Sequence, residues 1–412
     1  MSPVVPQEIA DQILDMIPDT PDGIRALKSA SLVCRSFRPT ACARLFRRIE
    51  LRDSNSEPKL DILLQRAPHL LRYVQVLRII GGLYTHAGRF PRSTTLPTSL
   101  QALRSEGSHR VTLRRIELYG VDWEVMSSAM QAVLLDLLAC SSLCGVRLRD
   151  VNNCPPNLVD RLPPSVKDLD ISNTDIPLIT TFRCLLQLET LTIRSHIAKH
   201  NQSITGNMWQ TSAGWLTRLR SLELSICDTN MWPIYRDIVQ HASSSLEELC
   251  ILINITAENF NSMDFRRFPR IRKIIIITPR LRNWMICLAS FRAAIVWLSQ
   301  SLSNMSHDND IDQVTIRFCV AITHGHKWNA PQFDAGIERT AWESLDETLS
   351  QPNLAWSKTF GGIHLQICTD TQYLYDYLDG LVHANLPRMV RSKKLHVTKE
   401  SFSNVAYDIE RV

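Results

Sequence analysis

The sequence predicts an α/β protein in which a small N-terminal helical module, residues 1–51, precedes an irregular repeat domain, residues 52–412. Three observations predict this fold: short amphipathic helical patterns in the first fifty residues, a six-residue apolar signature that recurs along the chain, and helical patterns between its copies. A chain of 412 residues, 44% of them hydrophobic, can bury the core of about two or three domains or of one elongated repeat array.

Three short helical patterns open the chain. Pro6 stands where a helix tolerates proline in its first turn, and Ile9 and Ile13 begin an apolar stripe at helical spacing. A second pattern starts near Ile24, and a third follows Pro39. A module of this size cannot bury all of its apolar positions by itself. Either the rest of this chain or a partner protein must therefore cover them, and the periodicity leaves both open.

This module resembles a known family, the F-box, in its fungal form. The segments that carry the resemblance are VPQEIADQILDMIP and ALKSASLVCRSFRPTACARLFRRIEL, within residues 4–51. Val5 stands where leucine is more usual and Phe37 where tryptophan is frequent, and both keep the surface apolar. The resemblance implies binding to a Skp-type adaptor, which connects such proteins to a cullin-RING ubiquitin ligase. It places the adaptor contacts on Pro6, Ile9, Ile13, Leu27, Val33, Cys34 and Phe37, with Arg35, Arg38, Arg44, Arg47 and Arg48 as a solvated rim.

The repeat domain is predicted from the signature L-x-x-L-x-L, with other aliphatic residues allowed. Clear copies, between residues 113 and 278, start at Leu113, Leu143, Val166, Leu188, Leu219, Leu246 and Ile271, and weaker ones at Val74, Ile311 and Phe360. Successive clear copies begin 22 to 31 residues apart, the period of leucine-rich repeats. We expect each copy to form a strand of a parallel sheet on the concave side of a solenoid, with helices, such as residues 124–139 and 233–242, and loops outside.

Strand alternation predicts which side chains face away from the leucines, on the open face of the sheet. The candidate target-binding residues on this face are Tyr119, Arg147, Arg149, Arg194, Glu223, Leu252, Ile275 and Ile277. The last three are apolar where solvent is expected. Two explanations remain open: the helical segment 279–303 or the C-terminal segment folds over them, or they form part of a recognition patch.

Searches for chemistry give no catalytic constellation. The chain lacks a phosphate-binding glycine loop, a nucleophile elbow and a zinc-protease helix, so we expect no enzyme activity and no cofactor. Cys140 with Cys144, and His324 with His326, lack further ligands at zinc spacing, so buried structural cysteines are favoured over a metal site. The apolar segment 284–298 is short for a membrane span. Without a signal peptide, a cytoplasmic or nuclear location is expected.

The leading functional hypothesis is a non-catalytic substrate receptor of an SCF-type cullin-RING ubiquitin ligase, with a target protein bound by the repeats. The alternative is a repeat scaffold that never engages a ligase. A nucleic-acid-binding repeat protein that uses the arginines is the least favoured hypothesis, and the net charge of +5 neither requires nor excludes it. We therefore expect protein partners, with neither nucleic acid nor membrane.

Overall fold

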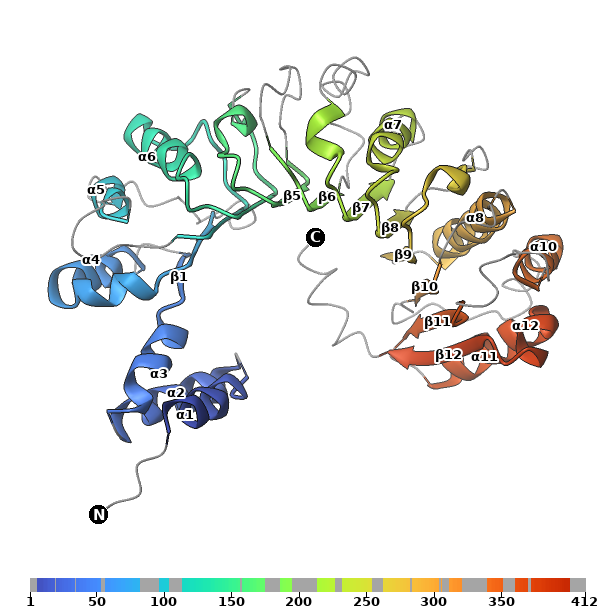
Figure 1. Cartoon of the computed structure of the whole chain (residues 1–412), viewed down its shortest axis with the longest axis horizontal. Helices are drawn as coiled ribbons and strands as arrows, with labels where there is room; N and C mark the ends of the chain where they lie inside the picture. Colours follow the sequence, from blue (N-terminus) through green and yellow to red (C-terminus); the bar gives the residue numbers. More distant parts are fainter. Residues whose placement is uncertain are drawn as a thin grey trace. The chain divides into compact units, whose positions relative to one another are not determined.

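The computed structural model, drawn in Figure 1, describes residues 6–18, 20–33, 35–52, 56–81, 96–103, 113–155, 158–174, 186–194, 213–226, 232–253, 262–281, 284–303, 305, 311–320, 339–350, 360–369 and 372–400. The chain divides into two compact units. Unit 1 comprises residues 1–170 and 174–177, and unit 2 comprises residues 171–173 and 178–412. Strands are neighbours in chain order, from β1 to β12. The predicted α/β architecture, with N-terminal helices and a parallel sheet, is confirmed.

Unit 1 contains the N-terminal helices and the first strands. Its helices are α1 (Gln7–Asp15), α2 (Pro21–Val33), α3 (Phe37–Leu45), α4 (Ser56–Arg66), α5 (Leu96–Gln101) and α6 (Ser128–Leu138), with 3-10 turns at Pro68–Tyr73 and Val159–Arg161. Its strands are β1 (Arg48–Leu51), β2 (Val76–Ile80), β3 (Arg115–Tyr119), β4 (Gly145–Arg149) and β5 (Asp168–Ser172), of which the last two residues belong to unit 2. Strands β1 to β4 pair in parallel.

The three N-terminal helices enclose a small core of their own. Leu14, Leu27 and Ala41 are buried there, and Phe37 packs against them. The Arg44 guanidinium donates to the backbone carbonyls of Leu14 and Ile17 at the end of α1, where the helix leaves carbonyls without helical partners. Arg44 is therefore a structural residue of this core, which corrects its expected place on the solvated rim.

Each clear copy of the repeat signature leads into a strand of the sheet. The copies at Leu113 and Leu143 start two residues before β3 and β4, and the weaker copy at Val74 starts two residues before β2. On the face towards the helices, Leu77, Ile116 and Leu148 are fully buried. Figure 1 shows α4, α5 and α6 along that side of the unit 1 strands. The leucines thus form the continuous apolar layer that the signature predicts.

Two local features recur with the repeat. The residue seven positions after a repeat start has a left-handed φ in three copies, with 58° at Gly120, 53° at Asp150 and 48° at Asn173. Glycine, aspartate and asparagine tolerate this conformation best. A serine directly before a repeat start also donates to the carbonyl of the preceding start residue. These hydrogen bonds are Ser142 to Leu113 at 2.8 Å, Ser165 to Leu143 at 2.7 Å and Ser245 to Leu219 at 2.8 Å.

Unit 2 continues the same pattern of strand and helix. Its strands are β6 (Thr190–Arg194), β7 (Ser221–Ile226), β8 (Glu248–Ile253), β9 (Lys273–Leu281), β10 (Gln313–Val320), β11 (Ile363–Cys368) and β12 (Leu395–Glu400), all paired in parallel. Its helices are α7 (Trp232–Ala242), α8 (Trp284–Leu302), α10 (Arg339–Ser350), α11 (Gln372–Asn385) and α12 (Pro387–Arg391), with 3-10 turns at Ala213–Leu216 and Phe265–Arg267. The predicted return helices are confirmed as α6 and α7.

Helix α8 packs on the leucine side of the unit 2 strands. Its Phe291 stacks on Phe318 of β10, with ring centroids 4.1 Å apart, and its Trp297 meets Phe265 edge-on at 6.1 Å. Phe318 alternates with Arg317 along β10, so α8 lies on the side opposite to the open face. Among the described residues, no helix combines the length and apolar character needed to cross a membrane.

Candidate functional site

The first candidate surface consists of exposed apolar side chains on and next to α1 and α2. Six large apolar side chains are exposed there: Ile9 (45%), Ile13 (49%), Met16 (84%), Ile24 (42%), Leu32 (86%) and Val33 (71%). We call these six residues the module surface. Along α1, Ile9, Ile13 and Met16 follow the spacing of one helical stripe, while Ala10 and Leu14 form the second, buried stripe. So many large apolar side chains exposed on one small module indicate a protein-binding surface.

The predicted adaptor contacts fall into three groups. Pro6, Ile9, Ile13 and Val33 are exposed. Leu27 is only 2% exposed, and Phe37 is half-buried against the same core. Leu27 is therefore a core residue of the module, which corrects its predicted place on the surface, while Phe37 stays a predicted contact. Cys34 lies outside the described residues.

The predicted adaptor contacts omit three exposed residues of the module surface, Met16, Ile24 and Leu32. Met16 lies three positions after Ile13 and seven after Ile9, so the helical spacing contained a signal for it. Leu32 is flanked by Val33 in the same exposed turn of α2. The surface therefore extends to the ends of α1 and α2.

The second candidate surface is the open face of unit 1, where charged side chains form a ladder across the strands. The strand register places Glu50, Arg78, Glu117 and Arg147 side by side. Arg78 lies 3.4 Å from Glu50 and 2.6 Å from Glu117. Asp170 accepts from Arg147 at 2.9 Å and from Arg149 at 2.8 Å. We call these six residues the charge ladder.

Tyr119 joins the charge ladder through its ring and its hydroxyl. The guanidinium carbons of Arg78 and Arg149 lie 5.1 Å and 5.9 Å from its ring centroid, and Arg147 donates to its hydroxyl at 3.4 Å. Burial acts to lower the pKa of Arg147, but Tyr119 and the ladder carboxylates outweigh burial and raise it. The arginine therefore stays charged although it is half-buried.

The arginines of the ladder form ion pairs with carboxylates of the same chain. Glu117 is 2% exposed and Asp170 4%, and buried carboxylates of this kind need opposite charges beside them. Two residues before Glu117 on β3, Arg115 forms an ion pair with Asp168 at 2.6 Å. Burial raises the pKa of Asp168 by more than the nearby charge of Arg115 lowers it. Arg147 and Arg149 are thus already paired with carboxylates and do not form an open anion-binding site. The face around Tyr119 carries charges that are paired with one another.

The third candidate surface is the open face of unit 2. Arg194 donates to Glu223 at 2.7 Å. In register with Glu223 stand Cys250 and then Ile275, and these two belong to an apolar cluster with Leu252 and Ile277. Burial is the main cause that raises the pKa of the Cys250 thiol. The open face thus changes from paired charge to apolar side chains from β7 to β9.

The apolar cluster is more buried than an exposed recognition patch requires. Leu252 is 6% and Ile277 8% exposed, while Ile275 is half-buried. One proposed cover is corrected: segment 279–303 contains α8, which packs on the opposite side of the sheet through Phe291. Residues 401–412 lie outside the described part of the chain.

No metal-binding group of three or more suitable side chains occurs within the described ranges. The expectation of buried structural cysteines is wrong for the predicted pair, because Cys144 is exposed and Cys140 half-buried. His324 and His326 lie outside the described residues. Neither protein-family models nor curated proteins give a match to this sequence.

Proposed function

We propose that this chain is the substrate-binding subunit of an SCF-type cullin-RING ubiquitin ligase. Its N-terminal module binds a Skp-type adaptor, and its repeat domain binds a target protein in the cytoplasm or nucleus. The observation that carries the proposal is the module surface, six exposed large apolar side chains on or next to α1 and α2, in a module whose sequence resembles an F-box. The chain provides no nucleophile in this role; it raises the local concentration of target lysines beside the transferring enzyme.

The build of the module supports this role. Its own core, around Leu14 and Ala41, fixes the helices, so the surface is held in place before a partner arrives. Preorganisation of this kind lowers the entropic cost of association. Exposed arginines, Arg35 and Arg38, border the apolar residues in sequence. An apolar centre with a charged border is the usual composition of a protein interface.

We infer that the repeats are of the leucine-rich type. Three observations support this: the spacing of the signature, the left-handed residue seven positions after the start, and the serine hydrogen bond from one repeat to the preceding one. The target would bind on the open face, around Tyr119 in unit 1 and around Arg194 and Glu223 in unit 2. The charges there are paired, which favours a folded protein or a mixed-charge peptide over a polyanion.

Calorimetric titration with a purified Skp-type adaptor tests the proposal. We expect the full chain to bind, and Ile9→Asp and Val33→Asp each to weaken binding at least about tenfold, because each places a charge in the centre of an apolar interface. Both positions are exposed, so the substitutions leave the core of the module intact. Val125→Asp, a matched substitution at a position 70% exposed outside the module, should bind like the wild type. A folded wild-type chain that ignores the adaptor, or Asp variants that bind undiminished, would contradict the proposal and favour a scaffold.

A further inference from the structure

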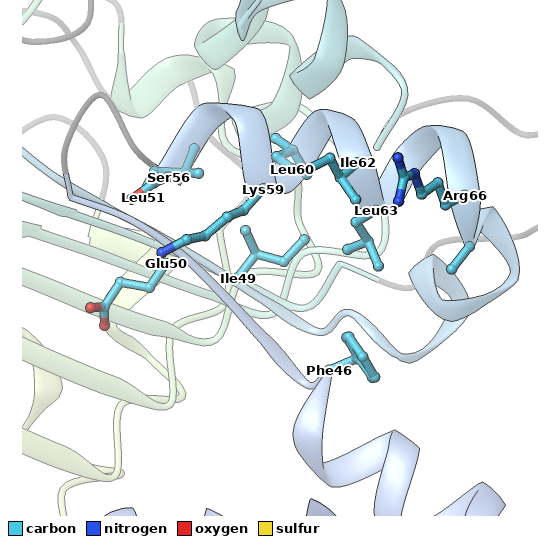
Figure 2. A pocket seen from close by; sticks show the side chains of 11 residues that line it. Phe46, Ile49, Glu50, Leu51, Ser56, Lys59, Leu60, Ile62, Leu63 and Arg66 are labelled. Atoms are coloured by element: carbon cyan, nitrogen blue, oxygen red, sulfur yellow. The ribbon is translucent and has the colours of Figure 1, made fainter.

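A groove of about 400 Å³ lies where the N-terminal module meets the repeat domain. Its apolar walls are Phe46, which follows α3, Ile49 of β1, and Leu60, Ile62 and Leu63 of α4. Figure 2 shows α4 running above β1, with Ile49 and Leu63 in the gap between the two elements. We call this site the end groove.

The end groove exists because the repeat array begins here. In a stacked array each repeat covers its neighbours on both sides, and a terminal repeat leaves one side of its apolar layer open. β1 is the first strand of the sheet, and α4 contacts α5 of the next repeat on one side. No residue of β2 or α5 lines the groove, which places it on the other side of α4. Ile62 there is 50% exposed.

The charge around the end groove is positive. Lys59 and Arg66 line it, and both are exposed. Glu50 is the only carboxylate among the eleven lining residues, all of which lie in the described part of the chain. Its charge is matched, because Arg52 contacts it and Arg78 lies 3.4 Å away.

We propose that the end groove binds an acidic amphipathic helix of a partner protein, which takes the place of the missing neighbouring repeat. The apolar stripe of that helix lies against Ile49, Ile62 and Leu63, and its carboxylates lie beside Lys59 and Arg66. A helix in an apolar groove is a recurrent mode of peptide recognition, and a cavity of this volume holds its anchoring side chains. The proposal does not depend on adaptor binding, since none of the module surface residues lines the groove.

Fluorescence polarisation with the full chain tests this proposal. The probe is a fluorescein-labelled helical peptide of about sixteen residues, with leucines at positions i, i+3, i+4 and i+7 and glutamates on its other faces. A second peptide keeps the leucines and replaces every glutamate with lysine. We expect saturable binding of the glutamate peptide and binding of the lysine peptide that is weaker by tenfold or more.

Variants of the chain locate the binding. Ile62→Asp and Lys59→Glu should each lower the affinity for the glutamate peptide about tenfold, because one adds charge to the apolar wall and the other reverses an attractive charge. The controls Val125→Asp and Arg161→Glu make the same changes at exposed positions outside the groove and should bind like the wild type. Absence of saturable binding, equal binding of the two peptides, or equal losses in variants and controls would overturn the proposal. Circular dichroism melts of all four variants show whether each is folded.

Discussion

The open faces of the two units differ in the side chains that they carry: mainly paired charges in unit 1, and an apolar cluster beside a charged pair in unit 2. In unit 1, charged and aromatic side chains on the open face have partners on neighbouring strands, as Arg78 does in Glu117. In unit 2, one such pair, Arg194 with Glu223, is followed by an apolar cluster that includes Leu252 and Ile277. The comparison shows that strand alternation fixes which residues reach the open face but leaves its chemistry free.

The difference has an energetic consequence. A charged face that is satisfied by its own pairs can stay open to solvent, although buried members such as Glu117 then depend on their partners. An apolar face is stable only when it is covered, and the low exposure of Cys250, Leu252 and Ile277 shows that little of it meets solvent. Substitutions should therefore act through lost ion pairs in unit 1 and through lost packing in unit 2.

The largest expected effect is the break of the charge ladder at its centre. Glu117→Ala removes the carboxylate that Arg78 and Arg147 share and leaves their charges without this partner. We expect the free energy of unfolding to fall by about 3 kcal/mol, the cost of breaking a buried ion pair. Urea denaturation of the full chain measures it, and Glu124→Ala, at an exposed position, is the control. Equal midpoints for the two variants would show that the ladder is not a stabilising network.

A smaller effect is expected in the apolar cluster of unit 2. Leu252→Ala removes buried methyl groups and should lower the free energy of unfolding by about 2 kcal/mol, near the lower end of the range for core leucines. The same urea experiment measures it, with Val125→Ala as the exposed apolar control. A change below about 0.5 kcal/mol, as is usual for surface positions, would mean that the cluster is open and available as a recognition patch.

The sequence predicts most strands because a copy of the leucine pattern leads into each of β2 to β11, and the structure confirms these strands at the expected copies. The last strand, β12, was missed, since LHVTKE lacks the signature and none of its residues is buried. The left-handed turns at Gly120, Asp150 and Asn173 were present in the sequence as residue types at constant spacing.

The surfaces were harder to predict than the strands. A small helix with apolar residues on two sides does not show which side faces the core, so Leu27 was assigned to the surface while Leu32, which is exposed, was missed. Arg44 looks like a rim residue until its contacts with α1 are known. Likewise, the charge ladder depends on strand register, which places Glu117 between Arg78 and Arg147. Register is a property of the folded sheet that the repeat spacing alone does not determine.

The central claim is that the module surface, rather than the repeat sheet, binds a Skp-type adaptor. Amide hydrogen exchange of the full chain, with and without the adaptor, tests it most directly, because it locates protection along the backbone. We expect slower exchange across α1 and α2, between Gln7 and Val33, and unchanged exchange in strands β3 to β12. Unchanged exchange in both helices at saturating adaptor, or protection confined to the strands, would contradict it.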